Sequence, residues 1–327
     1  MDIPVYKPPL WMRPAMVQTG LASLKFRKRG THDMERAARE MILDCSADET
    51  GENIRLMGHY SRSVENKALV IFLHGWEGSI DSTYVKSSAR LLFDHGCSVF
   101  RLNFRDHGDT HHLNEGIFLA TRFDEVMEGV NQACALSNDA PIYIIGFSLG
   151  GNFALRIARS LKETDAPKIS HIFAVSPVID PWSAAPLVDE NKLVQRYFKK
   201  KLIATMERNQ RLYPDKHDFS RAVKCKTIME MSEIILLKYS GYPDLESYFS
   251  AYGIKPDDLS DCPVGVSLIM SKDDPVVPAN HIDSLNLSEN CLDIRLNYGG
   301  HNGFFESLNG PTWYDKYMKE VIYHDIC

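Results

Sequence analysis

The sequence predicts an α/β fold in which helices cover both faces of a mostly parallel central sheet. Two features of the 327 residues predict it. From residue 68 onward, short apolar runs rich in β-branched side chains alternate with segments whose apolar residues have helical spacing. The runs at 68–73 and 141–145 are continuously apolar, which is typical of strands buried on both faces. Repeated strand–helix units of this length join parallel strands of one sheet.

The remaining elements follow from their own patterns. Helical apolar faces are expected after Asn152, over 83–94, over 312–323, and in the segment that contains Phe123, Val126, Val130 and Ala133. Further strands are expected at 97–103, 170–175, 264–270 and 292–296. Two weaker strand patterns, 40–45 and 54–60, flank a turn-like segment at 48–52. They predict an antiparallel hairpin at an edge of the sheet.

The alternation of strands and helices stops between residues 181 and 260. A long helical pattern there has four apolar residues on one face, Val194, Phe198, Leu202 and Met206, and a second helix is expected over 227–239. Because this segment is longer than a plain crossover requires, we expect a helical cap over the strand ends. Val194, Phe198, Ile234 and Leu237 on its helices are expected to form the apolar wall of a cavity of limited size. The run 199–201, three lysines, is expected to be a solvated helix face, and a contact with acidic lipid or a partner is the alternative.

Residues 1–35 are expected to form an N-terminal arm packed on a single domain that spans 1–327. Four prolines forbid a long helix in this arm: Pro4, Pro8, Pro9 and Pro14. The arm also carries a basic run at 25–29, for which a role at a membrane surface is the alternative to a solvated segment.

Composition excludes several classes of function. The net charge of −6 argues against general affinity for nucleic acid. No apolar run is long enough for a membrane span, and the N-terminus lacks the pattern of a secretory signal, so we expect a cytoplasmic protein. The seven cysteines have no C-x-x-C spacing, which suits free thiols rather than disulfides or a zinc site, and Cys97 and Cys134 are expected in the core. Nothing in the sequence addresses the oligomeric state.

The segment Gly146-Phe147-Ser148-Leu149-Gly150 has the G-x-S-x-G pattern of a nucleophile elbow between a strand and a helix. A serine on so sharp a turn needs neighbours without Cβ atoms, because strand and helix approach closely there. The turn exposes the Ser148 hydroxyl and places the Leu149 N–H at a helix start, where a developing negative charge is stabilised. A glycine-rich turn without catalytic function is the alternative.

The loop after the strand at 68–73 contains His74, Gly75, Trp76 and Gly78. Its glycines allow an unusual backbone path, so the Trp76 N–H is expected to point at the elbow as the second oxyanion donor. An ordinary strand-to-helix turn is the alternative. His74 is expected to support this loop rather than to take part in chemistry.

An acid and a histidine follow two later strands. Asp273 and Asp274 come directly after 264–270, and either of them could orient a histidine. His301 follows 292–296 on a loop with three nearby glycines. Because ligands bind at the carboxyl ends of parallel strands, these side chains are expected to meet at Ser148. The resulting order of serine, acid and histidine is that of α/β-hydrolases.

The segment 105–112 contains three histidines and two aspartates. A metal site is the alternative here, but the residues lack the helical i, i+4 spacing of paired ligands. We expect no metal and no cofactor. The segment is expected to line the mouth of the pocket, with Arg105 and Asp106 bonded to the backbone.

These motifs together resemble the YheT-like branch of the α/β-hydrolases, which includes ABHD-type lipid esterases. The resemblance runs from about residue 6 to 305 and includes the pair Gln18-Thr19, the loop at 74–79, the segment 103–105, the elbow and the acid loop at 271–278. The sequence departs from the pattern at Met16 and at 106–108. The resemblance favours Asp274 over Asp273 as the acid and implies hydrolysis of carboxylic esters.

The expected function is therefore hydrolysis of esters with short or medium acyl chains, with Ser148, Asp274 and His301 as the catalytic triad. The amides of Trp76 and Leu149 are the expected oxyanion donors, and an acyl ester is the expected small-molecule partner. Two alternatives remain open: the same triad acting as a thioesterase, amidase or acyltransferase, and a binding protein without activity.

Overall fold

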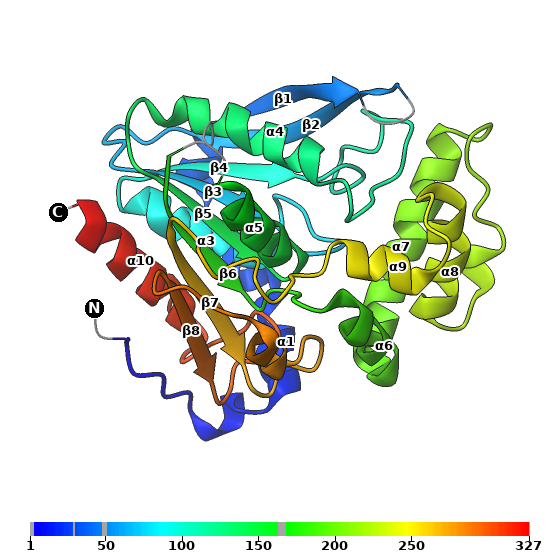
Figure 1. The fold of residues 1–327 in the computed structure, drawn as a ribbon. Coiled ribbons are helices and arrows are strands. Elements are labelled where there is room, and N and C mark those ends of the chain that lie inside the picture. Colours follow the sequence, from blue (N-terminus) through cyan, green and yellow to red (C-terminus); the bar gives the residue numbers. More distant parts are fainter. Residues whose placement is uncertain (1–2, 29, 48–50, 163–167, 327) are drawn as a thin grey trace.

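The computed structural model describes residues 3–28, 30–47, 51–162 and 168–326. Within these residues, eight strands form one sheet in the order β1-β2-β4-β3-β5-β6-β7-β8 (Figure 1). The strands are β1 (Ala38–Ala47), β2 (Asn53–Ser61), β3 (Leu69–Leu73), β4 (Ser98–Asn103), β5 (Ile142–Phe147), β6 (Ile169–Val175), β7 (Gly265–Ser271) and β8 (Cys291–Leu296). Each of them was expected from the sequence, and the expected ends differ from the observed ends by at most two residues.

Strands β3 to β8 pair in parallel, whereas β1 pairs with β2, and β2 with β4, in antiparallel orientation. The expected hairpin at the sheet edge is confirmed. The turn expected at 48–52 lies partly outside the described residues, because the description omits 48–50. Since the central strands are parallel, their carboxyl ends lie along one edge of the sheet, where binding sites form in such folds.

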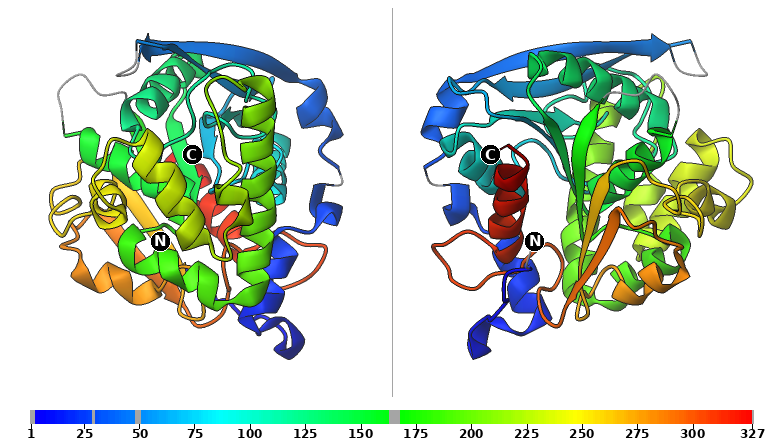
Figure 2. Two further views of the ribbon diagram at one scale, coloured as in Figure 1. Left: turned by 90° about the vertical axis from the view of Figure 1, so that its right-hand side faces the viewer. Right: turned by 60° about the vertical axis from the view of Figure 1, so that its left-hand side comes forward.

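Helices cover both faces of the sheet (Figures 1 and 2). On one face lie α3 (Thr83–Asp94) and α10 (Trp313–Ile326), and on the other lie α4 (Phe123–Cys134) and α5 (Leu149–Ser160). Alternate side chains of β3 belong to the two cores. Val70 and Phe72 pack with α3 and α10, whereas Leu69, Ile71 and Leu73 pack with α4 and α5. Burial on both sides explains why this strand is continuously apolar.

Four helices separate β6 from β7 and lie together beyond one edge of the sheet (Figure 1). These inserted helices are α6 (Pro181–Glu190), α7 (Lys192–Leu212), α8 (Ile228–Tyr239) and α9 (Leu245–Ala251), with the 3-10 turn η4 (Ala222–Lys224) after α7. All residues of 181–260 are described, and none of them forms a strand. The division of 1–327 into one domain with a cap at 181–260 and an arm at 1–35 stays a prediction.

The N-terminal segment forms short helices only, as its prolines predict. They are η1 (Leu10–Met12), α1 (Ala15–Ala22), η2 (Lys25–Lys28) and α2 (His32–Arg36), and residues 1–2 and Arg29 lie outside the described residues. The buried Gln18 fastens this segment to the loop after β8. Its Nε2 atom donates to the Phe305 carbonyl (3.1 Å) and its Oε1 atom accepts from the Phe305 N–H (2.7 Å).

None of the helices in the described ranges has the length and apolar character needed to cross a bilayer. The cytoplasmic location stays a prediction. Cys97 and Cys134 are buried in the two cores, as expected, and both are free thiols. Cys327 lies outside the described residues.

Candidate active site

Ser148 sits on a sharp turn between β5 and α5. Its backbone angles, φ 55° and ψ −116°, lie in a region that non-glycine residues rarely occupy. Close backbone approach imposes this turn. A Cβ atom on Gly146 would lie 2.1 Å from the Gly150 carbonyl oxygen, and one on Gly150 would lie 2.3 Å from the Leu73 carbonyl oxygen. The spacing of glycines in the motif is therefore a packing requirement, and the structure contains the elbow expected from the sequence.

The structure brings Ser148, His301 and Asp274 into one hydrogen-bonded line. His301 Nε2 lies 2.9 Å from Ser148 Oγ, and His301 Nδ1 lies 2.8 Å from Asp274 Oδ2. Because a carboxylate oxygen only accepts, Nδ1 carries the proton, and Nε2 accepts from the serine hydroxyl. The Asp274 side chain is completely buried, and its Oδ1 accepts from the N–H groups of Val276 (2.8 Å) and Val277 (3.0 Å).

Two other aspartates near the site accept hydrogen bonds from backbone N–H groups instead. Asp273 Oδ1 accepts from the Gly300 N–H (2.9 Å) and from the Ser271 hydroxyl, so this side chain ties the acid loop to the histidine loop. Asp180 caps α6 by accepting from the Ser183 N–H (3.2 Å). Of the two neighbouring acids that the residues alone left open, Asp274 is the one that contacts His301.

The N-terminal segment supports the histidine loop directly. Thr19 Oγ1 accepts from the His301 N–H (2.9 Å) and donates to the Ala15 carbonyl (2.8 Å). Gly300, with φ 51°, lies so close to α1 that a Cβ atom there would be 2.3 Å from the Ala15 carbonyl oxygen. Sequence reasoning missed this contact. Its only signal was the pair Gln18-Thr19, which was noted as part of a family resemblance.

His74 supports the loop after β3, as expected. It is fully buried, its Nδ1 donates to the Gly75 carbonyl (2.8 Å), and its Nε2 accepts from the Phe104 N–H (3.2 Å). Burial, together with the neighbouring His107, lowers the pKa of His74 well below its usual value. A neutral imidazole fits both hydrogen bonds, because only the neutral ring has one donor and one acceptor.

The same loop packs against the elbow. A Cβ atom on Gly75 would lie 3.1 Å from Ser148 Cβ, so the chain passes next to the nucleophile candidate. In the part of the chain that the structure describes, the N–H groups of Trp76 and Leu149 donate no hydrogen bond. Leu149 is the first residue of α5, where an N–H group has no intrahelical partner. Neither expected donor therefore has another hydrogen-bond partner among the described residues.

Comparisons with known proteins agree with this fold and site. A family model described as the alpha/beta hydrolase fold matches residues 68–217. The chain therefore has the α/β-hydrolase fold. A putative hydrolase from Agrobacterium vitis S4 superposes on this chain with a TM-score of 0.57 at 15% identity, covering 89% of this chain and 99% of the other. This likeness supports the fold.

Two curated relatives bear on the branch within the superfamily. The monoacylglycerol lipase of Saccharomyces cerevisiae is 23% identical over 291 residues, covering 80% of this chain and 61% of the lipase. The putative esterase YheT of Escherichia coli is 22% identical over 264 residues, covering 79% of this chain and 77% of YheT. The chain therefore spans about three fifths of the yeast lipase, and these relatives agree with a YheT-like, ABHD-type branch.

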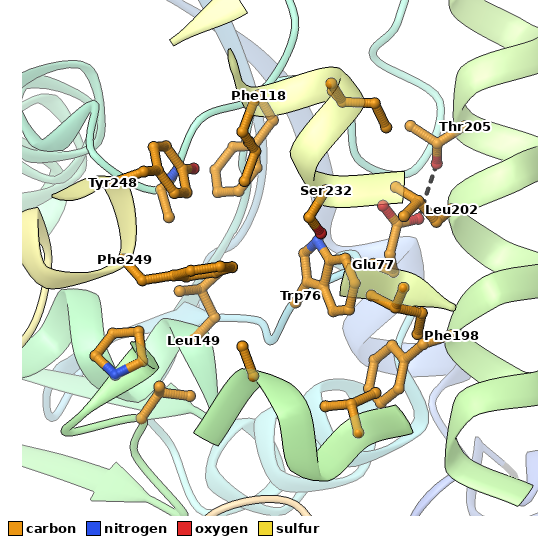
Figure 3. A pocket seen from close by; sticks show the side chains of 18 of the residues that line it. Trp76, Glu77, Phe118, Leu149, Phe198, Leu202, Thr205, Ser232, Tyr248 and Phe249 are labelled. Atoms are coloured by element: carbon orange, nitrogen blue, oxygen red, sulfur yellow. Dashed lines mark hydrogen bonds between the residues drawn. The ribbon is translucent and has the colours of Figure 1, made fainter. Parts of the chain in front are cut away.

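An apolar cavity of about 180 Å³ opens beside Ser148. Its walls come from the sheet edge and from the inserted helices, and they include Trp76, Phe118, Leu149, Phe198, Leu202, Tyr248 and Phe249 (Figure 3). Of the wall residues expected from the sequence, Phe198 lines this cavity and Val194 lines a neighbouring one. The expectation for α8 was wrong. Leu237 is exposed and Ile234 does not line the cavity, because α8 turns Ile235 and Leu236 toward it instead.

Helix α7 is fastened to the loop after β3 by polar contacts. Lys201 Nζ donates to the Glu77 carbonyl (2.7 Å), and the Thr205 hydroxyl donates to Glu77 Oε2 (2.8 Å; Figure 3). Lys199 Nζ likewise donates to a backbone carbonyl, that of Cys225, whereas Lys200 is exposed. The expectation that the lysine run is a solvated face is therefore wrong for two of its three residues.

The segment 105–112 forms part of the wall behind the site. His107 bridges two loops, since its Nε2 accepts from the Glu77 N–H (3.1 Å) and its Nδ1 donates to the Arg105 carbonyl (2.7 Å). Asp106 bonds the backbone, as expected, whereas the Arg105 guanidinium pairs with Glu125 (2.6 Å). The histidine nearest the site in this segment therefore has a supporting role.

Asp106 is a buried carboxyl on the cavity wall. Its Oδ2 accepts from the Phe118 N–H and from Asn209 Nδ2, each at 2.9 Å. Burial raises the pKa of Asp106 to about 7, and burial likewise raises the pKa of Glu77 to about 7. A carboxyl whose folded-state pKa lies above its ordinary value contributes stability at low pH and loses that contribution as the pH rises toward 7.

Replacing Asp106 with asparagine should stabilise the protein relative to the wild type as the pH increases. Asparagine keeps an acceptor oxygen and never becomes charged. Between pH 5 and 8, the free energy of unfolding of Asp106→Asn should therefore rise by roughly 2–3 kcal/mol relative to that of the wild type. Urea unfolding at several pH values measures this shift. For the exposed Asp109→Asn, the difference in the free energy of unfolding from the wild type should not change with pH. The same result for Asp106→Asn would contradict the raised pKa.

Proposed function

We propose that this α/β-hydrolase is a serine hydrolase that cleaves carboxylic esters of short or medium acyl chains. The observation that carries the proposal is the hydrogen-bonded line of Ser148, His301 and Asp274 at the carboxyl edge of the parallel sheet. The names of the relatives, an esterase and a lipase, support an ester as the substrate.

In the first half of the reaction, His301 Nε2 takes the proton of the Ser148 hydroxyl while Oγ attacks the ester carbonyl carbon. Asp274 stabilises the imidazolium that forms and holds the ring in the required tautomer. The C–O bond to the leaving alcohol then breaks, and Nε2 gives its proton to the departing oxygen. Ser148 is left as an acyl ester.

In the second half, a water molecule replaces the alcohol. His301 takes one proton from the water while the water oxygen attacks the acyl carbon. The C–Oγ bond then breaks as the proton passes from His301 to Ser148 Oγ. The net reaction consumes one water and yields one carboxylic acid and one alcohol. Each step uses only the protein's own side chains, its backbone amides and water.

The amides of Trp76 and Leu149 are the proposed oxyanion donors. Trp76 and Leu149 line the same apolar cavity as Ser148, and neither N–H group donates to another described group. Leu149 opens α5, so the helix dipole adds to the stabilisation of the negative oxygen. Donors that are fixed before the reaction need no reorganisation, and removing one such donor typically costs 10²–10³-fold in kcat in comparable enzymes.

Replacing Ser148 with alanine should abolish the activity without unfolding the protein. We expect ester turnover to fall by about 10⁴-fold or more, and labelling by a fluorophosphonate probe to disappear. Ser160→Ala, at the other end of α5, is the matched control and should keep both properties. Retention of a tenth of the activity by Ser148→Ala would rule out this nucleophile. Thioesters and amides tested beside esters decide between ester hydrolysis and its alternatives.

The two neighbouring aspartates should differ sharply when each is changed to asparagine. Asp274→Asn presents an N–H group to His301 Nδ1 and favours the wrong tautomer, so kcat should fall by about 10³- to 10⁴-fold. Asp273→Asn keeps an acceptor for the Gly300 N–H and should cost about 10-fold or less. Steady-state kinetics of both variants give the comparison, and the reverse ranking would assign the acid to Asp273.

The acyl cavity should set a chain-length optimum. Each buried methylene contributes about 0.8 kcal/mol, so kcat/KM for nitrophenyl esters should rise about 4-fold per added carbon and fall once the cavity is full. Leu202→Phe narrows the cavity and should shorten the optimum, whereas Leu212→Phe, exposed at the end of the same helix, should not. Esters of two to sixteen carbons test this. A continuous rise to the longest chains, with a jump above the micelle concentration, would contradict the proposed size limit.

A further inference from the structure

A second, larger cavity of about 560 Å³ also reaches Ser148. It lies between the N-terminal segment, the loop after β3 and the start of α7. Among the described residues, His301 lines this cavity and not the apolar one. In the proposed mechanism His301 protonates the leaving oxygen, so the leaving alcohol must lie on the side of His301. The apolar cavity then takes the acyl chain, and the second cavity takes the alcohol.

The wall of the second cavity carries three lysines, Lys25, Lys28 and Lys201. Lys201 is held in place, since it donates to the Glu77 carbonyl (2.7 Å) and lies over the Tyr197 ring at 4.9 Å. Lys25 and Lys28 come from η2, and in the described residues neither of them has an ion pair. All three ammonium groups belong to the leaving-group side of the site.

The carboxylates nearby already have cationic partners. Asp81, which also lines the cavity, pairs with Lys86 (2.5 Å), and Glu35 pairs with Arg101 (2.7 Å) and Lys86 (3.3 Å). Glu77 accepts from Thr205, and burial raises its pKa to about 7, which reduces its negative charge at neutral pH. The charges of the second cavity therefore sum to an excess of positive charge.

Lys28 is in an unfavourable position when the cavity contains no anion. Its side chain is half-buried, and burial is the main cause that lowers its pKa. The neighbouring Lys86 and Lys25 ammonium groups act in the same direction, whereas Asp81 and Glu35 oppose it. A negative group bound in the cavity would compensate both the desolvation and the repulsion. The rest of the wall includes the apolar side chains of Leu193, Val194 and Phe198, which suit the carbon skeleton of an alcohol.

We propose that the leaving alcohol carries an anionic substituent, a carboxylate or a phosphate, which binds at Lys25 and Lys28 in the second cavity. This inference rests on the proposed ester hydrolysis. Substrates are therefore esters with an apolar acyl half and a negatively charged alcohol half. The lysines of the second cavity select the alcohol by its charge, while the apolar cavity selects the acyl chain by its length.

The test uses three butyrate esters of meta-substituted phenols, which differ only in a carboxylate, a phosphate or a neutral carboxamide. They are assayed as monomers in dilute buffer, and each kcat/KM is divided by the rate constant of hydroxide hydrolysis to remove electronic differences. The wild type should prefer an anionic ester to the carboxamide by about 5- to 20-fold, as expected for one charge near two lysines. The better of the two anions identifies the group. The preference should fall as salt is added.

The decisive variant is Lys25→Gln/Lys28→Gln, which should reduce the preference to about 2-fold or less. The control Lys200→Gln/Lys224→Gln removes the same charge from exposed positions outside the cavity and should keep the preference. An equal kcat/KM for all three esters, or equal losses in both double variants, would overturn the anionic alcohol while leaving ester hydrolysis intact. If the wild type hydrolyses none of the three esters, the proposed function itself is overturned.

Discussion

The position of Ser148 depends on the contact of backbone with backbone where α5 meets the carboxyl ends of β3 and β5. Gly146 and Gly150 are the residues that permit this approach, since a Cβ atom on either would overlap a carbonyl oxygen. The strained backbone of Ser148 costs about 1–3 kcal/mol. The fully buried side chains of Phe153, Leu155 and Ile157 on α5 each contribute roughly 1.5–3 kcal/mol, so helix packing outweighs the strain.

The histidine loop is held from two distant parts of the chain. Thr19 binds the His301 N–H from the N-terminal segment, and Asp273 binds the Gly300 N–H from the end of β7. The imidazole therefore depends on backbone anchors that take no part in the proposed proton transfer. This arrangement explains why two adjacent aspartates follow β7: Asp274 holds the ring, and Asp273 holds the loop that carries it.

The strands and the elbow were predictable because their signals are local: buried parallel strands are continuously apolar, and the sharp turn requires glycines at fixed spacing. Contacts between distant residues left no such signal. The residues alone did not distinguish Asp273 from Asp274. The carbonyl groups that Lys199 and Lys201 bind lie on other segments of the chain. The side of α8 that faces the cavity is set by the neighbouring helices. Helix α8 is apolar around most of its surface, so its pattern did not identify the buried face.

The two cavities share walls, and this links the two halves of the proposed substrate. Trp76 and Phe198 line both cavities, and their rings stack at 5.1 Å. Phe198 belongs to α7, which Lys201 and Thr205 fasten to Glu77, the residue next to the proposed oxyanion donor. A shift of α7 would therefore change the acyl cavity, the alcohol cavity and the Trp76 amide together. The position of one helix would thus affect selectivity at both ends of the proposed substrate, whereas the Ser148, His301 and Asp274 line rests on the sheet and its loops.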